Sequence, residues 1–214
     1  HTLVMTATPI PRTLMLTAYG DLDWSRLDEK PAGRQPVDTR VVPATRIDDI
    51  VDGLGRTLAA GGKAYWVCPL VEESEKSDLA AAEDRFAALH GIFGEAVGLI
   101  HGRMKAAEKE AVMERFADGA IRLLVATTVI EVGVNVPDAT IMVIEHAERF
   151  GLAQLHQLRG RVGRGEAAST CVLLYHQPLG ATAKARLETL SKTDDGFVIS
   201  EEDLRVRGAG EVLG

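Results

Sequence analysis

The stretch Leu123-Leu124-Val125-Ala126 is a short run of apolar side chains with no polar residue among them. A run of this length without alternation predicts a strand that is buried on both faces, as strands are in a parallel sheet. Comparable runs occupy residues 3–5, 64–70, 96–100, 141–144 and 171–175. We therefore expect a parallel sheet whose strands are spread over most of the chain.

Helical patterns lie between these runs. One apolar stripe with the spacing of an amphipathic helix consists of Ile47, Ile50, Val51, Leu54 and Leu58. Thr45 and Asp48 predict a capping box at the start of this helix, and Gly61 predicts its end. Similar stripes follow within residues 79–89 and 112–116. Because strands and helices alternate, the predicted fold class is α/β with a doubly wound parallel sheet.

The composition is that of a globular protein. Of the 214 residues, 46% are apolar and 26% are charged, which argues against wholesale disorder. No apolar run approaches the roughly 20 residues of a membrane-spanning helix, so we expect no membrane contact. The two isolated cysteines, Cys68 and Cys171, indicate a reducing compartment, so we expect a cytoplasmic location. The formal net charge of −7 argues against a protein that holds nucleic acid by bulk charge. Any contact with nucleic acid must therefore be local.

No group of metal-ligating residues stands out in the sequence. Cys68 and Cys171 lack CxxC spacing, which argues against a zinc site and a disulfide framework. The histidines His90, His146, His156 and His176 also lack the spacing of metal ligands. We expect this chain to bind no metal ion.

Two regions break the alternation of strands and helices. Residues 21–36 contain prolines, a glycine and mixed charge without any period, which predicts a linker. No strand is expected from residue 178 onward. There Leu187 and Leu190 indicate one helix, and residues 197–207 indicate a second arm. We expect a small helical hairpin over residues 178–214.

The segment that carries the strongest chemical signal is Gln157-Leu158-Arg159-Gly160-Arg161-Val162-Gly163-Arg164. Residues 149–165 contain four arginines and no acidic residue, although the whole chain is acidic. The guanidinium fork matches phosphate oxygens, and glycines let the backbone approach a ligand closely. The segment therefore predicts an anion site, with a solvated basic loop as the alternative.

This pattern, QxxGRxGR, resembles motif VI of superfamily 2 helicases. Other motifs of that superfamily follow in the same order. Residues 6–9, Thr-Ala-Thr-Pro, resemble motif III, and residues 123–128 with 131–137 resemble motif V. His101-Gly102-Arg103 resembles a phosphate-contacting motif between motifs IV and V. The resemblance implies the RecA-like, P-loop NTPase-type fold of a helicase motor domain.

Longer stretches narrow the resemblance to the RecG family of ATP-dependent DNA helicases. These stretches are residues 5–13, 65–74, 101–105, 151–165 and 203–211. The last one also resembles the translocation motif of the transcription-repair coupling factor family (Mfd), and Ala209 is nearer to the Mfd version. A duplex DNA translocase of the Mfd type is therefore the alternative. A non-catalytic nucleic-acid-binding module is a remote alternative of another class.

The RecG resemblance covers nearly the whole chain and implies its division. Residues 1–20 would be the last strand and helix of a first motor domain, and residues 21–36 the linker. Residues 37–177 would form the second RecA-like helicase domain, and residues 178–214 a truncated translocation-motif hairpin.

The resemblance also assigns roles around the nucleotide. Arg161 and Arg164 would be arginine fingers that stabilise charge developing on the γ-phosphate, and Gln157 would orient these groups or the nucleotide. Gly133 and Asn135 of motif V would lie near ATP, with a turn glycine as the alternative for Gly133.

Further roles concern DNA and its coupling to ATP. By the resemblance, His101, Gly102, Arg103 and Thr127 would contact DNA phosphates, which positions a strand without reading its sequence. For His101 the alternative is a satisfied histidine at a strand end, and for Thr127 a hydroxyl that caps a turn. Residues implied in coupling ATP state to translocation are Thr6, Thr8, Arg186 and Arg207.

The ATP-holding half of such a motor is not found in the sequence. Gly62-Lys63, the one Gly-Lys pair, is followed by Ala64 and lacks a glycine at position 57, so no Walker A motif is present. We therefore expect a fragment that is inactive alone, and a parent enzyme that binds ATP and Mg²⁺ mainly through its first motor domain. The implied partners are branched or duplex DNA, that first motor domain and a DNA wedge domain of the same parent chain. The parent would be a monomeric bacterial enzyme at the nucleoid, where it remodels branched DNA and stalled replication forks in recombination and repair.

Overall fold

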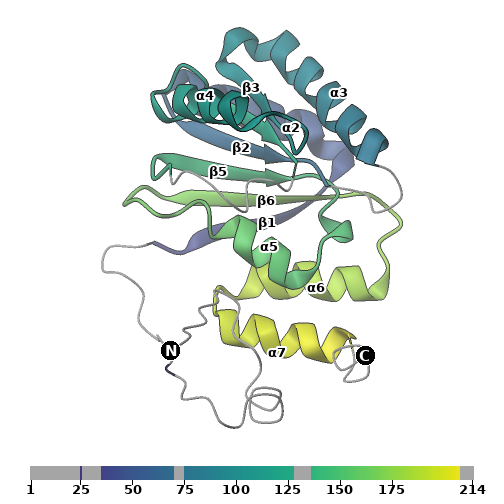
Figure 1. Ribbon diagram of the computed structural model, residues 1–214. Coiled ribbons are helices and arrows are strands. Elements are labelled where there is room, and N and C mark those ends of the chain that lie inside the picture. The colour runs from purple at the N-terminus through teal and green to yellow at the C-terminus, as the bar shows by residue number, and fades with distance from the viewer. Residues whose placement is uncertain (1–24, 26–34, 70–74, 128–135, 208–214) are drawn as a thin grey trace, which may run out of the picture.

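Six parallel strands form one sheet within residues 25, 35–69, 75–127 and 136–207, which the computed structural model describes (Figure 1). The strand order is β1-β6-β5-β2-β4-β3, and every neighbouring pair runs parallel. The strands are β1 (Val37–Pro43), β2 (Lys63–Val67), β3 (Val97–Ile100), β4 (Leu123–Ala126), β5 (Ala139–Ile144) and β6 (Ser169–Tyr175). This arrangement confirms the α/β class with a parallel sheet.

Helices lie in the connections from β1 to β2, from β2 to β3, from β3 to β4 and from β5 to β6, as parallel pairing requires. The α-helices are α2 (Ile47–Ala59), α3 (Glu75–Phe93), α4 (Ala106–Ala117), α5 (Leu152–Arg159), α6 (Ala181–Lys192) and α7 (Gly196–Arg207). Short 3₁₀ turns are η1 (Ala44–Arg46), η2 (Gly94–Ala96) and η4 (Ala147–Arg149). Figure 1 shows α6 and α7 lying side by side at the end of the described chain.

Helices cover both faces of the sheet and divide the core in two. On one face, Leu54 and Leu58 of α2 and Leu89 of α3 pack with Trp66 and Val125 of the sheet. The other face carries α4, α5, α6 and α7, whose buried side chains include Phe116, Leu155, Leu187 and Ile199. Every residue of β4 is buried, because this strand has covered faces and a neighbour on each side. This burial on both faces explains why apolar runs without alternation mark the central strands.

The predicted runs match the observed strands with shifts of a few residues. The run at 123–126 coincides with β4, whereas the runs at 141–144 and 171–175 each start two residues after the strand begins. The run at 64–70 predicts a strand beyond Val67, where β2 ends. The expected strand at residues 3–5 lies outside the described residues.

Strand β1 and helix α5 were missed by the sequence patterns. β1 lies at the edge of the sheet. The burial of its first five residues alternates between half-buried and exposed, so the strand carries no continuous apolar run. The interval 152–159 mixes buried leucines with His156, Gln157 and Arg159, which hides the helical period.

The predicted capping box at the start of α2 was wrong. This helix begins at Ile47 after the 3₁₀ turn η1, and its N-cap residue Arg46 makes no side-chain capping bond. The predicted end is confirmed, since Gly61 adopts a φ of 87° just after the helix and its N–H donates to the carbonyl of Leu58.

The helical hairpin expected after residue 178 is present as α6 and α7. The turn between the helices is fixed by Asp195, whose Oδ1 accepts a hydrogen bond from the backbone N–H of Phe197 at 2.8 Å. Leu187, Leu190 and Ile199 attach the hairpin to the core that lies under α5.

Candidate functional site

The predicted nucleotide-contacting and DNA-contacting residues that the structure describes fall into two groups at opposite edges of the sheet. Because all strands are parallel, their carboxyl ends lie at one edge. His101 and Thr127 directly follow β3 and β4 at that edge. The turn after α5 lies at the other edge, where Gly163 approaches Val37 and Ser169, the first residues of β1 and β6. The sequence could not show this separation.

The carboxyl-edge group is held together by backbone contacts. Thr127 N–H donates to the carbonyl of Ile100 at 3.3 Å, so the ends of β3 and β4 stay adjacent. After Ile100 the chain turns at His101, and Lys109 of α4 donates to the carbonyl of Gly102 at 3.0 Å. Gly102 and Arg103 are exposed, whereas Thr127 is only 2% exposed.

Two buried polar atoms at this edge lack a partner. Within the described residues, neither His101 Nδ1 nor Thr127 Oγ1 makes a hydrogen bond. Buried polar side-chain atoms are paired in the large majority of cases, and an unmet one costs about 1–3 kcal/mol. A hydroxyl and an imidazole N–H can both donate to an anionic oxygen. The geometry therefore suits a ligand with phosphate oxygens.

The second group lies on the turn that ends α5. This helix begins at Leu152, where Gln154 Oε1 accepts the backbone N–H of Gly151 at 3.1 Å. At its end, the Nε of Arg164 donates to the carbonyl of Gly160 at 3.0 Å. Arg164 and Gln157 are exposed and Arg161 is half-buried.

A glycine is required within this turn. Gly163 has a φ of 69°, and a Cβ there would lie 2.7 Å from Cγ2 of Val37. Both the left-handed backbone and the contact with β1 exclude a larger residue without movement. The glycine thus lets the turn with Arg161 and Arg164 sit directly on the sheet.

Arg161 and Arg164 bring positive charge to this edge, and their charges act on the ionisation of Tyr65 in β2. Burial raises the pKa of Tyr65 to about 12, and the charges of Arg161 and Arg164 act against that rise. Both guanidinium groups therefore lie within electrostatic reach of the Tyr65 side chain. Lys63 Nζ is paired at 2.8 Å with Asp138, so this lysine is neutralised by a carboxylate. The arrangement can present positive charge to a phosphate.

Arg159 differs from the other arginines of the same segment. It is 3% exposed, and its guanidinium donates to the carbonyls of Leu190 at 2.7 Å and Thr193 at 2.9 Å. Its Nη2 also lies 3.0 Å from Nδ1 of His156. Arg159 joins α5 to the end of α6 and is a structural residue.

Arg186 lies within α6 and contacts the turn η4. Its Nη1 donates to the carbonyl of Phe150 at 2.8 Å, and its Nη2 lies 3.4 Å from the carbonyl of Glu148. Arg207 is the last residue of α7. Four predicted site residues, Thr6, Thr8, Gly133 and Asn135, lie outside the described residues.

A buried ionic network at the carboxyl edge was missed by the sequence patterns. Glu145 accepts hydrogen bonds from the Nε of Arg85 at 2.8 Å and from the indole N–H of Trp66 at 2.8 Å. The guanidinium of Arg85 also lies 5.2 Å from the ring centroid of Trp66. Burial of Glu145 favours its neutral form, but the bonds and charge of Arg85 outweigh it, so the pKa of this carboxyl is lowered. The position of Glu145 just after an apolar run was the one available signal.

No helix in the described part of the chain is both long and apolar enough to cross a membrane.

Comparison with known proteins identifies similar chains. Residues 45–166 match the family described as the helicase conserved C-terminal domain. The whole chain is 59% identical to the ATP-dependent DNA helicase RecG of Escherichia coli K12 and 58% identical to that of Acidithiobacillus ferridurans. The chain spans about 31% of the length of these relatives.

Comparison with solved structures also finds similar chains. A structure of RecG bound to a three-way DNA junction superimposes with a TM-score of 0.81 and 45% identity, covering 96% of this chain and 27% of that one. Yeast Dbp5 bound to RNA and ADP BeF3 aligns with a TM-score of 0.57 and 18% identity, over 87% of this chain and 48% of that one. The second likeness shows the fold alone.

Proposed function

Since the chain belongs to the family of helicase conserved C-terminal domains, we propose that it is the second motor domain of an ATP-dependent DNA helicase of the RecG type. The parent enzyme would remodel branched DNA, including stalled replication forks, in recombination and repair. The observation that carries this proposal is the 45% identity to RecG over 96% of the chain, in a structure that contains a DNA junction.

ATP would bind between this domain and a first motor domain of the same parent chain, which would carry the Walker motifs and hold Mg²⁺. The turn after α5 fits the phosphate end of the nucleotide, because it presents Arg161 and Arg164 beside a glycine-lined backbone. These guanidiniums would stabilise the charge that develops on the γ-phosphate during hydrolysis. Gln157 would orient them, and Gly133 and Asn135 would lie near the nucleotide.

DNA would bind at the carboxyl edge of β3 and β4. Nδ1 of His101 and Oγ1 of Thr127 have no hydrogen-bond partner among the described residues. This supports the placement, because phosphate oxygens would satisfy both atoms. The exposed residues Gly102 and Arg103 would add a backbone approach and a positive charge. Contacts of this kind hold the DNA backbone in place and do not select a base sequence.

Coupling between the two edges would run through the helical hairpin. Arg186 ties α6 to the turn η4, which leads into α5, and Arg159 ties the end of α5 to the end of α6. A shift of α5 on ATP binding would therefore move α6. We assign Arg207 to the same hairpin and Thr6 and Thr8 to the coupling segment of the first motor domain.

The rest of the proposal concerns the parent protein. We expect a monomer with a DNA wedge domain, located in the bacterial cytoplasm at the nucleoid. The similar proteins from Escherichia coli and Acidithiobacillus ferridurans carry RecG names, which adds no support to the Mfd-type alternative.

The test is ATP-dependent strand separation by the full-length parent protein. A three-way DNA junction should be unwound much faster than a linear duplex of equal length, and RNA should give no stimulation. Equal activity on linear duplex would favour an Mfd-type translocase instead. Junction binding without ATP turnover would contradict the motor and indicate a binding module.

A further inference from the structure

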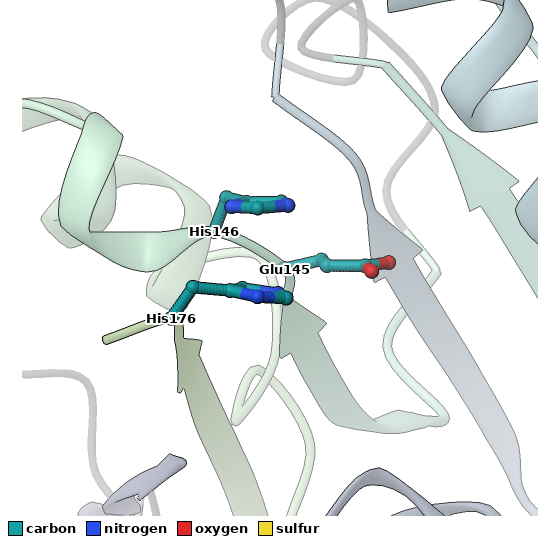
Figure 2. A group of neighbouring side chains, drawn as sticks. All are labelled: Glu145, His146 and His176. Atoms are coloured by element: carbon teal, nitrogen blue, oxygen red, sulfur yellow. The ribbon is translucent and has the colours of Figure 1, made fainter. Parts of the chain in front are cut away.

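Three side chains with metal-ligating atoms meet at the carboxyl edge of the sheet. Glu145 and His146 follow β5, and His176 follows β6, the neighbouring strand. Their potential ligand atoms all lie within 4.8 Å of one another (Figure 2). Glu145 and His146 are adjacent in the sequence, whereas His176 is far from them, so the parallel pairing of β5 and β6 brings His176 to the other two. None of them belongs to the proposed ATP or DNA contacts.

The surroundings of His146 are those of a metal-ligating histidine. Its Nδ1 lies 3.0 Å from Oε1 of Glu148. A carboxylate on one ring nitrogen fixes the tautomer and leaves the lone pair on the other nitrogen, Nε2, for a metal ion. The same Glu148 accepts the backbone N–H of His176 through Oε2 at 3.2 Å, so one carboxylate buttresses both histidines.

The backbone holds His146 in place. It is the one non-glycine residue with a positive φ, 51°, in the described chain. A left-handed backbone is strained at a residue other than glycine, and it persists where the surrounding structure holds the residue in place. The side chain of His146 therefore projects from a fixed point beside the end of β5.

The charge around the group suits a divalent cation. Arg85 balances one carboxylate, Glu145, and leaves the second, Glu148, to offset the charge of an ion. The hydrogen bonds from Arg85 and Trp66 do not exclude Glu145 as a ligand, because ligating carboxylates are commonly hydrogen-bonded in this way. Two imidazoles and one carboxylate form a ligand set that zinc and similar transition ions prefer, whereas Mg²⁺ prefers oxygen ligands alone.

One movement is needed for binding. The rings of His146 and His176 are stacked with centroids 3.8 Å apart and an interplanar angle of 9°, so their lone pairs lie in parallel planes. The His176 ring would have to tilt out of this stack to share an ion. His176 is exposed and lies beyond the end of its strand, so its ring has room to turn.

We propose that Glu145, His146 and His176 form a binding site for a transition-metal ion of the Zn²⁺ class, with Glu148 as the residue that orients His146. An ion there would tie the end of β5 to the end of β6, next to the turn that Arg186 contacts. The proposal does not depend on the helicase function.

Calorimetric titration of the 214-residue chain with Zn²⁺ tests the site directly. We expect one bound ion per chain, and no displacement by excess Mg²⁺. His176→Gln removes an exposed ligand without touching the core and should weaken binding by more than about tenfold. His90→Gln, which changes a half-buried histidine on α3, is the matched control and should leave the affinity unchanged.

Co²⁺ provides a second readout, because a tetrahedral site with nitrogen and oxygen ligands gives a visible absorption band. The band should appear with the wild-type chain and the His90→Gln variant and disappear with His176→Gln. The absence of Zn²⁺ binding at micromolar concentration would overturn the proposal. It would also be overturned if His176→Gln bound Zn²⁺ as tightly as the wild type.

Discussion

Arg159 donates a hydrogen bond to the backbone carbonyl of Leu190 at 2.7 Å and thereby fastens α5 to the first helix of the hairpin. Two residues further along, Arg161 is the predicted arginine finger. The segment 157–164 thus combines a buried structural arginine with arginines that we assign to a ligand. Composition could not separate these roles, because all are arginines in one glycine-rich stretch.

Replacement of Arg159 by Met should destabilise the chain. The substitution keeps much of the buried volume but leaves the carbonyls of Leu190 and Thr193 unpaired in the interior, at an expected total cost of about 2–4 kcal/mol. Urea denaturation followed by circular dichroism measures the loss. Arg149→Met, on an exposed arginine of η4, is the control and should stay within about 0.5 kcal/mol of the wild type. Equal stability of the two variants would contradict the structural role.

Gly163→Ala should destabilise the turn after α5. The alanine would adopt a φ of 69° and place its Cβ 2.7 Å from Val37, so we expect a loss of about 1–3 kcal/mol. Gly91→Ala is a control with the opposite sign. Gly91 lies in α3, where a Cβ would have no neighbour within 4 Å, so alanine should raise stability by up to about 1 kcal/mol. Thermal unfolding of both variants measures the difference, and a stable Gly163→Ala variant would refute the close approach to β1.

The Arg85–Glu145 pair predicts a dependence of stability on pH. Burial of Glu145 opposes its ionisation, yet Arg85 and Trp66 together lower the pKa of its carboxyl in the folded chain. A carboxyl with a lowered folded pKa stabilises the fold above its unfolded value of about 4.3, and this contribution is lost as the pH falls through the folded value.

Arg85→Met should therefore cost about 3 kcal/mol at pH 7, because it leaves a buried carboxylate without its partner. The difference from the wild type should shrink as the pH falls from the unfolded value towards the lowered pKa of Glu145. It should be smallest below that lowered pKa, where Glu145 is neutral in both proteins. Urea denaturation at pH 7 and at acidic pH gives the two values. A difference that stays constant over this range would show that the pair does not control the ionisation of Glu145.

Thr127→Val separates stability from DNA binding. The valine replaces a buried hydroxyl that has no partner in the described residues, so the stability of the chain should stay equal or rise. In the full-length parent, the affinity for junction DNA should fall by about tenfold, the effect of one lost hydrogen bond to a charged phosphate. Unfolding curves and fluorescence anisotropy measure the two quantities. Unchanged DNA affinity would remove Thr127 from the DNA site.

The sequence predicted the buried parts of this fold better than its edges. β4 is covered on both faces and paired on both sides, so its apolar run matches the strand residue for residue. β1 at the sheet edge has exposed Asp38 and Arg40 between half-buried residues, and its pairing with β6 comes from a segment far away in the chain. No local pattern reports such a pairing.

The sequence could point to candidate site residues where one local segment carries the chemistry. Gln157, Arg161 and Arg164 stand within a single short segment, and their spacing marked them. Glu145, His146 and His176 could not be grouped beforehand, because only the neighbouring positions of β5 and β6 bring them together. The expectation that these histidines have no ligand spacing holds along the chain but not across the sheet.

The proposed motor depends on Arg161 acting as an arginine finger, and ATP turnover by the full-length parent protein measures this role. Turnover with forked DNA should fall by about 10³-fold or more in Arg161→Ala, while ATP binding persists. Arg149→Ala should retain wild-type turnover. If Arg161→Ala hydrolysed ATP as fast as the wild type, the assignment of this segment to the nucleotide site would be wrong.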